Sequence, residues 1–211
     1  MRKWYPVVVI AVAALASIAL YPRLPERVAV HWDMHGVANG DAPRLGAAVF
    51  GPLVMLGLWA LMRGLPAVDP RRENYAKMEN AYSLMVNATL TLLLVIHLAV
   101  LAAALGVGIS MARLVPALIG ALFIVIGYAM PQARPNWFFG IRTPWTLSND
   151  RVWQRTHRVG GHLFVACGLV SLLGVVLPHA IGVALLVIAA LVASFGSIAF
   201  SYIAWKQETS E

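Results

Sequence analysis

The chain has 211 residues, of which 60% are hydrophobic and only 12% are charged. A soluble domain carries about 25% charged residues, so this composition argues against a soluble globular fold. The formal net charge is +7, which in a soluble protein would suggest nucleic-acid binding. In so hydrophobic a chain, the positions of the basic residues matter more than their sum. We therefore expect a membrane protein with no direct nucleic-acid partner.

Six apolar runs of 15 to 25 residues have about the length of a membrane helix, which needs roughly 17 to 25 residues to cross the hydrocarbon layer. They predict membrane helices over residues 6–20, 46–62, 82–106, 114–130, 161–177 and 181–205. The predicted fold is an all-α integral membrane bundle of about six transmembrane helices. We expect an N-terminal two-helix region, 1–65, with an extracytoplasmic loop at 21–45. A four-helix region, 66–211, follows and contains a cytoplasmic loop at 131–160.

The basic residues predict the orientation, because Lys and Arg accumulate on the cytoplasmic side of a membrane. One side holds most of them, namely Arg2, Lys3, Arg63, Arg71, Arg72, Lys77, Arg134, Arg142, Arg151, Arg155, Arg158 and Lys206. The other side holds Arg23, Arg27, Arg44 and Arg113. Both termini are therefore expected in the cytoplasm. The N-terminal stretch also resembles a signal peptide, but Trp4 and Tyr21 at its ends favour a retained helix anchored at both interfaces.

Polar residues are sparse inside the predicted spans, whose centres contain no Asp, Glu, Lys or Arg. Asn87, Thr91 and His97 fall within an arc of roughly 120° on the third span. They would line the path of a small transporter or channel, or they would form hydrogen bonds between helices. A stripe of small residues on the last span predicts close helix packing; it comprises Ala189, Ala193, Ser197 and Ser201.

The loop at 21–45 contains three potential metal ligands two residues apart, His31, Asp33 and His35. In an extended strand their side chains would share one face and would be the site of a metal-dependent membrane enzyme. The other interpretation is a polar, solvated loop that turns at its glycines. Because this spacing is unspecific, we expect no metal, no cofactor and no enzymatic activity.

Capping patterns predict two helix starts in the cytoplasmic loops. Asp69 precedes Pro70, which predicts a helix with the proline at its first position. Ser148 is the predicted N-cap of a helix that begins near Asn149 and continues into the fifth span. Further along, His157 would suit a general base, but no nucleophile with a defined partner accompanies it.

Aromatic and basic residues alternate along the loop at 131–160. The aromatic ones are Trp137, Phe138, Phe139, Trp145 and Trp153, and the basic ones are Arg134, Arg142, Arg151, Arg155 and Arg158. Such a mixture suits the lipid headgroup region, where rings sit at the boundary and guanidinium groups meet phosphates. Two interpretations follow: a packed interfacial loop that faces lipid, or a surface that binds a partner.

The segment NWFFGIRTPWTLSNDRVWQRTHRVGG, residues 136–161, resembles the signature of the SdpI immunity-protein family. Residues 69–82 resemble the first cytoplasmic segment of that family. The outer loop resembles the domain of unknown function that usually precedes the signature. The matching signature residues are Asn136, Gly140, Arg142, Thr143, Pro144, Trp145, Trp153, Thr156, His157 and Arg158, and the outer-loop matches are His31, Asp33 and Gly36. The family often has Gly-Asn near the end of the fourth span, where this chain has Gly127 and Tyr128.

This resemblance implies a function. The chain would be a non-enzymatic, multi-pass immunity protein of the bacterial cytoplasmic membrane. It would protect the cell from a secreted, membrane-active peptide toxin, and it would signal by sequestering a cytoplasmic repressor. The expected partners are therefore the lipid bilayer, the toxin and the repressor, and the signature residues would supply the binding surface.

Overall fold

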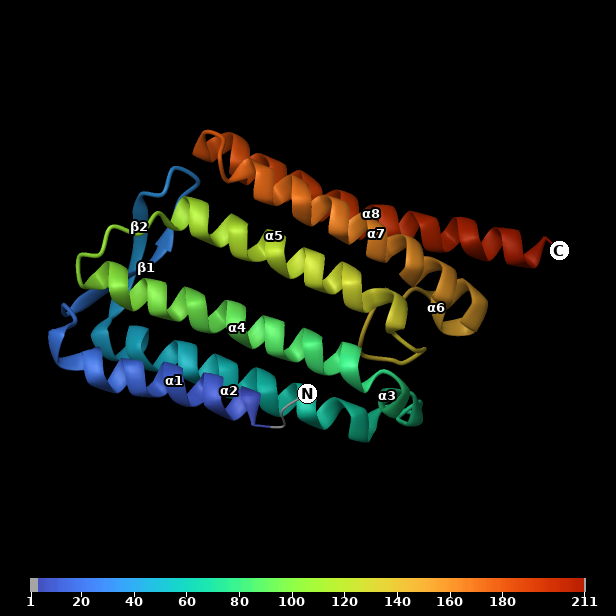
Figure 1. Ribbon diagram of the computed structural model, residues 1–211, viewed down its shortest axis with the longest axis horizontal. Helices are drawn as coiled ribbons and strands as arrows, with labels where there is room; N and C mark the ends of the chain where they lie inside the picture. The colour runs from blue at the N-terminus through green and yellow to red at the C-terminus, as the bar shows by residue number, and fades with distance from the viewer. Residues whose placement is uncertain (1–3, 211) are drawn as a thin grey trace.

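The computed structural model describes residues 4–210, and six of its helices are long and apolar enough to cross a membrane. They are α1 (Tyr5–Leu20), α2 (Arg44–Val68), α4 (Glu79–Ala104), α5 (Met111–Ala129), α7 (Asp150–Gly174) and α8 (His179–Thr209). They run alongside one another as a bundle (Figure 1). The predicted bundle of six spanning helices is confirmed, with each helix at the place where an apolar run was found.

Six short elements occupy the two ends of the bundle (Figure 1). At one end are η1 (Tyr21–Arg23), β1 (Arg27–Trp32) and β2 (Ala38–Pro43); at the other are α3 (Glu73–Lys77), η2 (Met130–Gln132) and α6 (Pro144–Ser148). The strands form an antiparallel hairpin, so the all-α prediction was wrong for the outer loop. The physical reason is Val28, which packs on Ala47, Ala48 and Leu101, and Gly36, which turns the chain with φ +81°.

Two of the predicted helix starts need correction. α2 continues to Val68, and the Asp69 carboxylate accepts the Arg71 N–H at 2.7 Å. Because of this turn, α3 begins only at Glu73, and Pro70 does not begin a helix. The N-cap of α7 is Asn149, whose side chain accepts from two backbone N–H groups, while Ser148 belongs to α6. The prediction that this helix begins near residue 149 and continues into the fifth span is confirmed.

The helices pack as two neighbouring groups. α4 packs on α1 and α2 around the buried side chains of Val9, Ala13, Met55 and Leu90. α5, α7 and α8 form the other group, on the far side of α4 from α1 (Figure 1). The tip of the β1–β2 hairpin reaches α5, because a Cβ added at Gly36 would lie 3.1 Å from that of Ala112. The hairpin therefore extends over both groups. The predicted division of the chain into an N-terminal region, 1–65, and a four-helix region, 66–211, stays a prediction.

Glycines bring α5 and α7 into close backbone contact at two levels. A Cβ added at Gly127 would lie 2.5 Å from the Gly161 carbonyl oxygen, and one at Gly168 would lie 2.6 Å from that of Gly120. Small residues allow the helix backbones to approach this closely. In a bilayer the hydrophobic effect does not drive helices together, so van der Waals contacts of this kind stabilise their association. The small-residue stripe of α8 is buried as well, which confirms close packing at Ala189, Ala193, Ser197 and Ser201.

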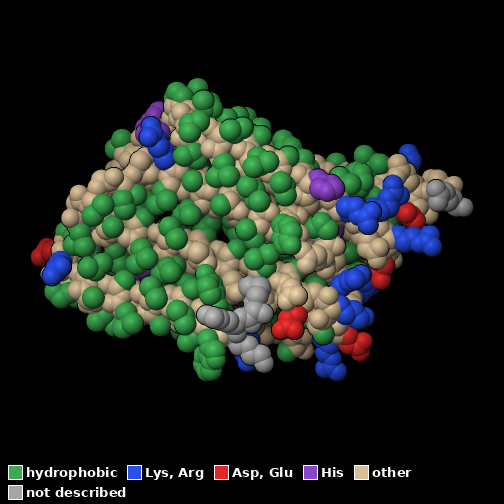
Figure 2. All heavy atoms as spheres, viewed as in Figure 1, with side chains coloured by type: hydrophobic (Ala, Val, Ile, Leu, Met, Phe, Trp, Pro, Cys, Tyr) green, Lys and Arg blue, Asp and Glu red, His purple; other side chains and the backbone are tan. Residues whose placement is uncertain are grey.

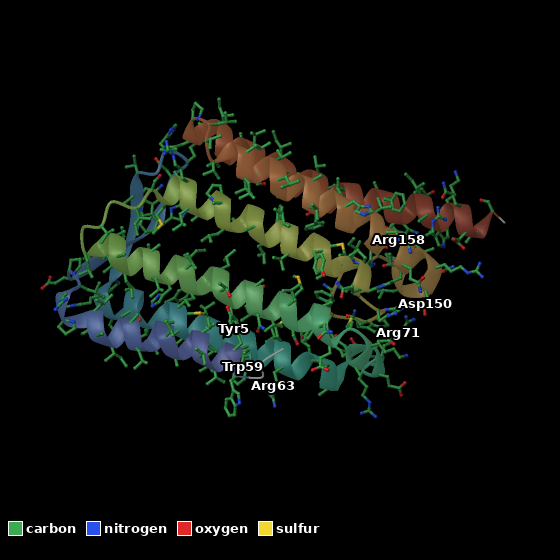
Figure 3. All side chains as sticks on the ribbon, in the orientation of Figure 1. Tyr5, Trp59, Arg63, Arg71, Asp150 and Arg158 are labelled. Atoms are coloured by element: carbon green, nitrogen blue, oxygen red, sulfur yellow. The ribbon has the colours of Figure 1, made fainter. Side chains whose placement is uncertain are left out.

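Charged side chains concentrate at one end of the molecule. In Figure 2, Lys and Arg gather around α3, α6 and the end of α8, while hydrophobic side chains cover the middle. Arg71 and Arg158 lie at this end (Figure 3). We call it the basic end, and the end with the hairpin the hairpin end. That the basic end faces the cytoplasm stays a prediction.

Replacement of Gly168 by Leu should destabilise the bundle, because the new side chain would force the α5 and α7 backbones apart. Overpacking of this kind costs about 1–3 kcal/mol. The matched control is Gly57→Leu on α2, where an added Cβ meets no atom within 4 Å. The measurement is reversible unfolding in mixed detergent micelles. Equal stability of the two variants would contradict the close α5–α7 contact.

Candidate functional site

Asn136 organises the segment that follows α5. Its side chain is fully buried. Its Nδ2 donates to the carbonyl oxygens of Arg134 at 2.8 Å and Phe139 at 2.9 Å. Its Oδ1 accepts the N–H groups of Phe138 at 2.9 Å and Phe139 at 2.6 Å. All four positions of the amide are therefore used, and the chain is fixed in a tight loop around one side chain.

Asp69 joins the turn after α2 to the same loop. The carboxylate is only 3% exposed, and its Oδ2 accepts the Trp137 N–H at 2.9 Å and the Tyr75 hydroxyl at 3.0 Å. Burial, and then the hydrogen bond and the charge of Asp69, raise the pKa of Tyr75 well above its usual value. The phenol therefore keeps its proton and remains a donor. It also lies 3.4 Å from the Oδ1 of Asn136.

His157 fixes the loop to α7. Its Nε2 accepts the Ile141 N–H at 2.9 Å, so the other nitrogen, Nδ1, donates to the Trp153 carbonyl at 2.8 Å. The ring stacks on the Trp153 indole with centroids 4.0 Å apart. Gly140 has φ +107°, and a side chain there would run into this ring. Both nitrogens are engaged with backbone and the ring is fully buried, so His157 holds the loop in place.

Thr143 connects α6 to α8. It caps α6 in a reciprocal arrangement with Thr146, and its Oγ1 lies 3.1 Å from the Oγ of Ser201. Next to it, the Trp145 ring packs edge-on to Tyr202 with centroids 5.2 Å apart. These contacts complete a set of buried polar bonds that we call the signature network: Asp69, Tyr75, Asn136, Thr143, Thr146, Trp153 and His157.

The signature residues divide into buried and exposed sets. Among residues 4–210, the Oγ1 of Thr156 is the one buried side-chain N or O atom without a hydrogen-bond partner. The predicted site residues that are buried are Asn136, Thr143, Trp153, Thr156 and His157; Gly140, Arg142, Pro144 and Arg158 are exposed, and Trp145 is half-buried. The buried side chains pack on protein, so among these predicted site residues only the second set is available to lipid or a partner.

Ion pairs brace the outside of the network. Arg71 meets Asp150 at 2.9 Å (Figure 3), which joins the α3 side to the start of α7. Arg155 meets Glu208 at 3.2 Å and ties α7 to the end of α8.

Sequence patterns missed the roles of Asp69 and Tyr75. The signal in the sequence was a lone acidic residue, Asp69, beside an apolar run. Its partner Trp137 lies 68 positions away along the chain.

The outer-loop candidates do not share one strand face. β1 ends at Trp32, and Asp33 accepts the N–H groups of His35 and Val37, each at 2.9 Å. The His31 ring bonds instead to Asn39. Across the described residues, no group of three or more His, Cys, Asp or Glu side chains is placed to hold a metal ion. The strand that would bring His31, Asp33 and His35 onto one face ends before Asp33, because Asp33 begins the turn at Gly36.

Two members of the predicted polar seam bond to α1. Thr91 donates to the Asn87 carbonyl at 2.7 Å, so the Tyr5 hydroxyl, 2.6 Å away, donates to Thr91. His97 bonds to Ser17 at 2.8 Å. The seam was interpreted either as the lining of a transport path or as hydrogen bonding between helices. The contacts of Thr91 and His97 with α1 support hydrogen bonding between helices.

The fold and the signature network define a multi-pass, helical membrane protein whose longest loop is folded around buried polar side chains. Residues 132–202 match the model of the SdpI/YfhL protein family, and residues 8–56 match a domain of unknown function, DUF1648. The chain is also 28% identical over 164 residues to Immunity protein SdpI of Bacillus subtilis (strain 168), covering 78% of this chain and 76% of that protein. The resemblance to the SdpI family is therefore confirmed. No solved structure matches the chain.

Substitution of Asn136 by Asp should loosen the network, because carboxylate oxygens would face the carbonyls of Arg134 and Phe139. Loss of buried hydrogen bonds costs about 1–3 kcal/mol for each group left without a partner. Limited proteolysis in detergent should then cut the segment 134–142 faster than in the wild type. The matched control is Asn80→Asp at an exposed position. Identical cleavage of all three proteins would show that the amide does not hold the loop.

Proposed function

We propose that this chain is a membrane-embedded immunity protein of the SdpI type, which protects the cell that makes it from a membrane-active peptide. One observation carries the proposal. The region that matches the SdpI/YfhL family, residues 132–202, contains most of the signature network, and the similarity to an immunity protein extends over 78% of the chain. The similarity therefore covers the part of the chain where polar side chains are most tightly organised.

The proposal places the protein in the bacterial cytoplasmic membrane with its basic end inside the cell. This orientation follows from the accumulation of Lys and Arg on cytoplasmic surfaces. α8 has 31 residues and is therefore about 46 Å long, whereas the hydrocarbon layer is about 30 Å thick. The ion pair of Arg155 with Glu208 places the excess length at the basic end. The signature network would then lie at the inner membrane surface, and the hairpin outside.

The exposed part of the loop supplies a surface for signalling. Trp137 is 50% exposed and Phe138 is 37% exposed, and the Arg142 guanidinium donates to the Trp137 carbonyl at 2.7 Å. Aromatic residues and arginine are the groups enriched in protein interfaces. Because the buried network holds the loop rigid, little side-chain and loop entropy is lost on binding. We propose that this surface docks the cytoplasmic repressor.

A strain that lacks the gene should become more sensitive to secreted, membrane-active peptides, and the wild-type gene should restore resistance. The Asn136→Asp variant should restore less resistance, because the network that shapes the inner end is loosened, whereas Asn80→Asp should restore it fully. Growth inhibition across a panel of such peptides is the measurement, with membrane abundance of each variant measured in parallel. Unchanged sensitivity of the deletion strain to the whole panel would contradict the immunity role.

A further inference from the structure

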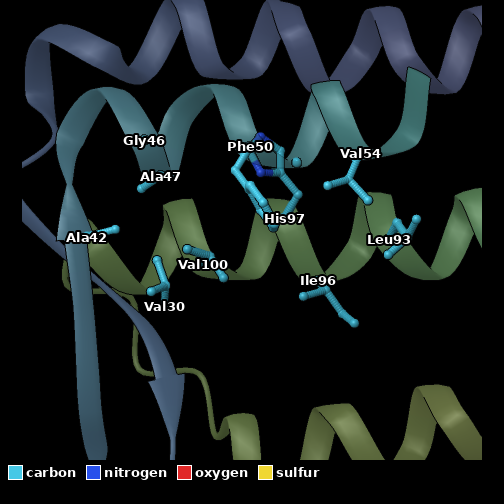
Figure 4. A pocket seen from close by; sticks show the side chains of 11 residues that line it. Val30, Ala42, Gly46, Ala47, Phe50, Val54, Leu93, Ile96, His97 and Val100 are labelled. Atoms are coloured by element: carbon cyan, nitrogen blue, oxygen red, sulfur yellow. The ribbon is translucent and has the colours of Figure 1, made fainter. Parts of the chain in front are cut away.

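Two cavities adjoin beneath the outer hairpin. Their volumes are about 440 Å³ and about 430 Å³, each within the range of ligand pockets. Val30, Ile96 and Val100 line both. Together they form a space between β1, α2, α4, α5 and α8 that we call the hairpin groove. Figure 4 shows its first lobe, between α2 and α4.

The groove exists because small residues occupy one of its walls. Gly46, Ala47 and Gly51 of α2 line the first lobe, and a Cβ added at Gly46 would meet no atom within 4 Å. These residues lie in the first turns of α2, and the facing residues lie in the last turns of α4. The first lobe is therefore inside the span but close to its hairpin end, at a depth where lipid tails and membrane-inserted molecules can reach it.

His97 gives the apolar first lobe one hydrogen-bond acceptor. The Ser17 hydroxyl donates its hydrogen to the Ala48 carbonyl at 2.7 Å. It must therefore accept from His97, whose Nε2 is 2.8 Å away. The neutral ring then carries a lone pair on Nδ1, beside Gly51, and no described residue donates to it. A ligand that offers an N–H or O–H group would satisfy this nitrogen.

The second lobe carries one negative charge at its mouth. Asp33 lines this lobe, and it is the only formally charged side chain among the described residues that line either lobe. The hydrogen bond from the Val37 N–H lowers the pKa of this carboxyl, with smaller contributions from the N–H groups of His35 and Gly36 and from the charge of His35. The mouth is therefore anionic. It would attract a cationic group and repel the phosphate of a lipid headgroup.

We propose that the hairpin groove binds the apolar helix of a membrane-inserted peptide, with a cationic group of that peptide at Asp33 and a side-chain donor at the Nδ1 of His97. This inference rests on the proposed immunity function and assigns it a site. The apolar lining accounts for affinity within the membrane, and the two polar points fix the orientation of the peptide. Charge favours a cationic peptide over an anionic lipid as the occupant.

Photo-cross-linking in phosphatidylcholine nanodiscs tests the site. The probe is a synthetic Leu/Ala helix with a diazirine at its centre, a serine facing the same side and a lysine at its outer end; its twin carries glutamate in place of the lysine. A Cβ added at Gly46 meets no atom within 4 Å, so the Gly46→Phe variant is designed to fill the first lobe, and it should cut labelling about tenfold, the equivalent of about 1.4 kcal/mol. The control Gly57→Phe, on the same helix, should label like the wild type.

Charge provides a second readout that does not depend on filling the groove. The lysine probe should label the wild type more strongly than its glutamate twin. Asp33→Asn keeps the side-chain acceptor for the turn but removes the charge, so it should abolish this preference. Equal labelling of Gly46→Phe and wild type, or no preference for lysine in the wild type, would overturn the inference. So would a photoreactive phospholipid that labels the groove and that the lysine probe does not displace.

The growth assay separates this inference from the immunity role. Gly46→Phe at normal membrane abundance should fail to restore resistance in the deletion strain, whereas Gly57→Phe should restore it. Full resistance with Gly46→Phe would overturn the groove as the site and leave the immunity role standing. Absence of protection by the wild type would overturn the immunity role itself, while the cross-linking pattern would still decide whether the groove takes an apolar, cationic helix.

Discussion

Hydrocarbon offers no hydrogen-bond partners, and this constraint governs where most polar groups of residues 4–210 are placed. Inside the spans, some polar side chains bond to a neighbouring helix, as Ser17 does with His97 and Tyr5 does with Thr91. Others, such as Ser171 and Ser197, donate to a carbonyl of their own helix. Helices associate by close backbone contact at Gly127 and neighbouring glycines. Charges and extensive polar networks are confined to the two ends. The placement of the hairpin at one end and of the signature network at the other follows from this exclusion.

The two ends of the bundle differ in how their polar and apolar side chains are arranged. At the basic end, buried polar side chains hold a long, aromatic segment in one shape and leave Arg142, Trp137 and Phe138 among the exposed residues. At the hairpin end, a two-stranded lid covers an apolar groove with few polar points. The proposed recognition of a peptide would use the hairpin end, and the proposed docking of a repressor would use the basic end. The helices α4, α5, α7 and α8 connect them physically.

The spans could be predicted from sequence because hydropathy over about 20 residues reflects a single physical requirement, the thickness of the hydrocarbon. The signature network could not be predicted, because the partners of Asp69 and His157 are backbone groups brought together only by tertiary folding. Local rules also failed where two candidates compete. Ser148 and Asn149 both suit an N-cap, and Asn149 is the one whose side chain accepts two backbone N–H groups. The hairpin was missed because its strands are short and are held by Val28 packing on helices distant in sequence.

The central claim is that the bilayer separates the hairpin from the signature network. Cysteine accessibility in intact cells tests it most directly, in a Cys167→Ala background, since Cys167 is the single cysteine of the chain. A membrane-impermeant maleimide should label Val37→Cys in the hairpin turn from outside. It should label Arg142→Cys only after the cells are opened. Labelling of Arg142→Cys in intact cells, at the rate seen for Val37→Cys, would contradict the account.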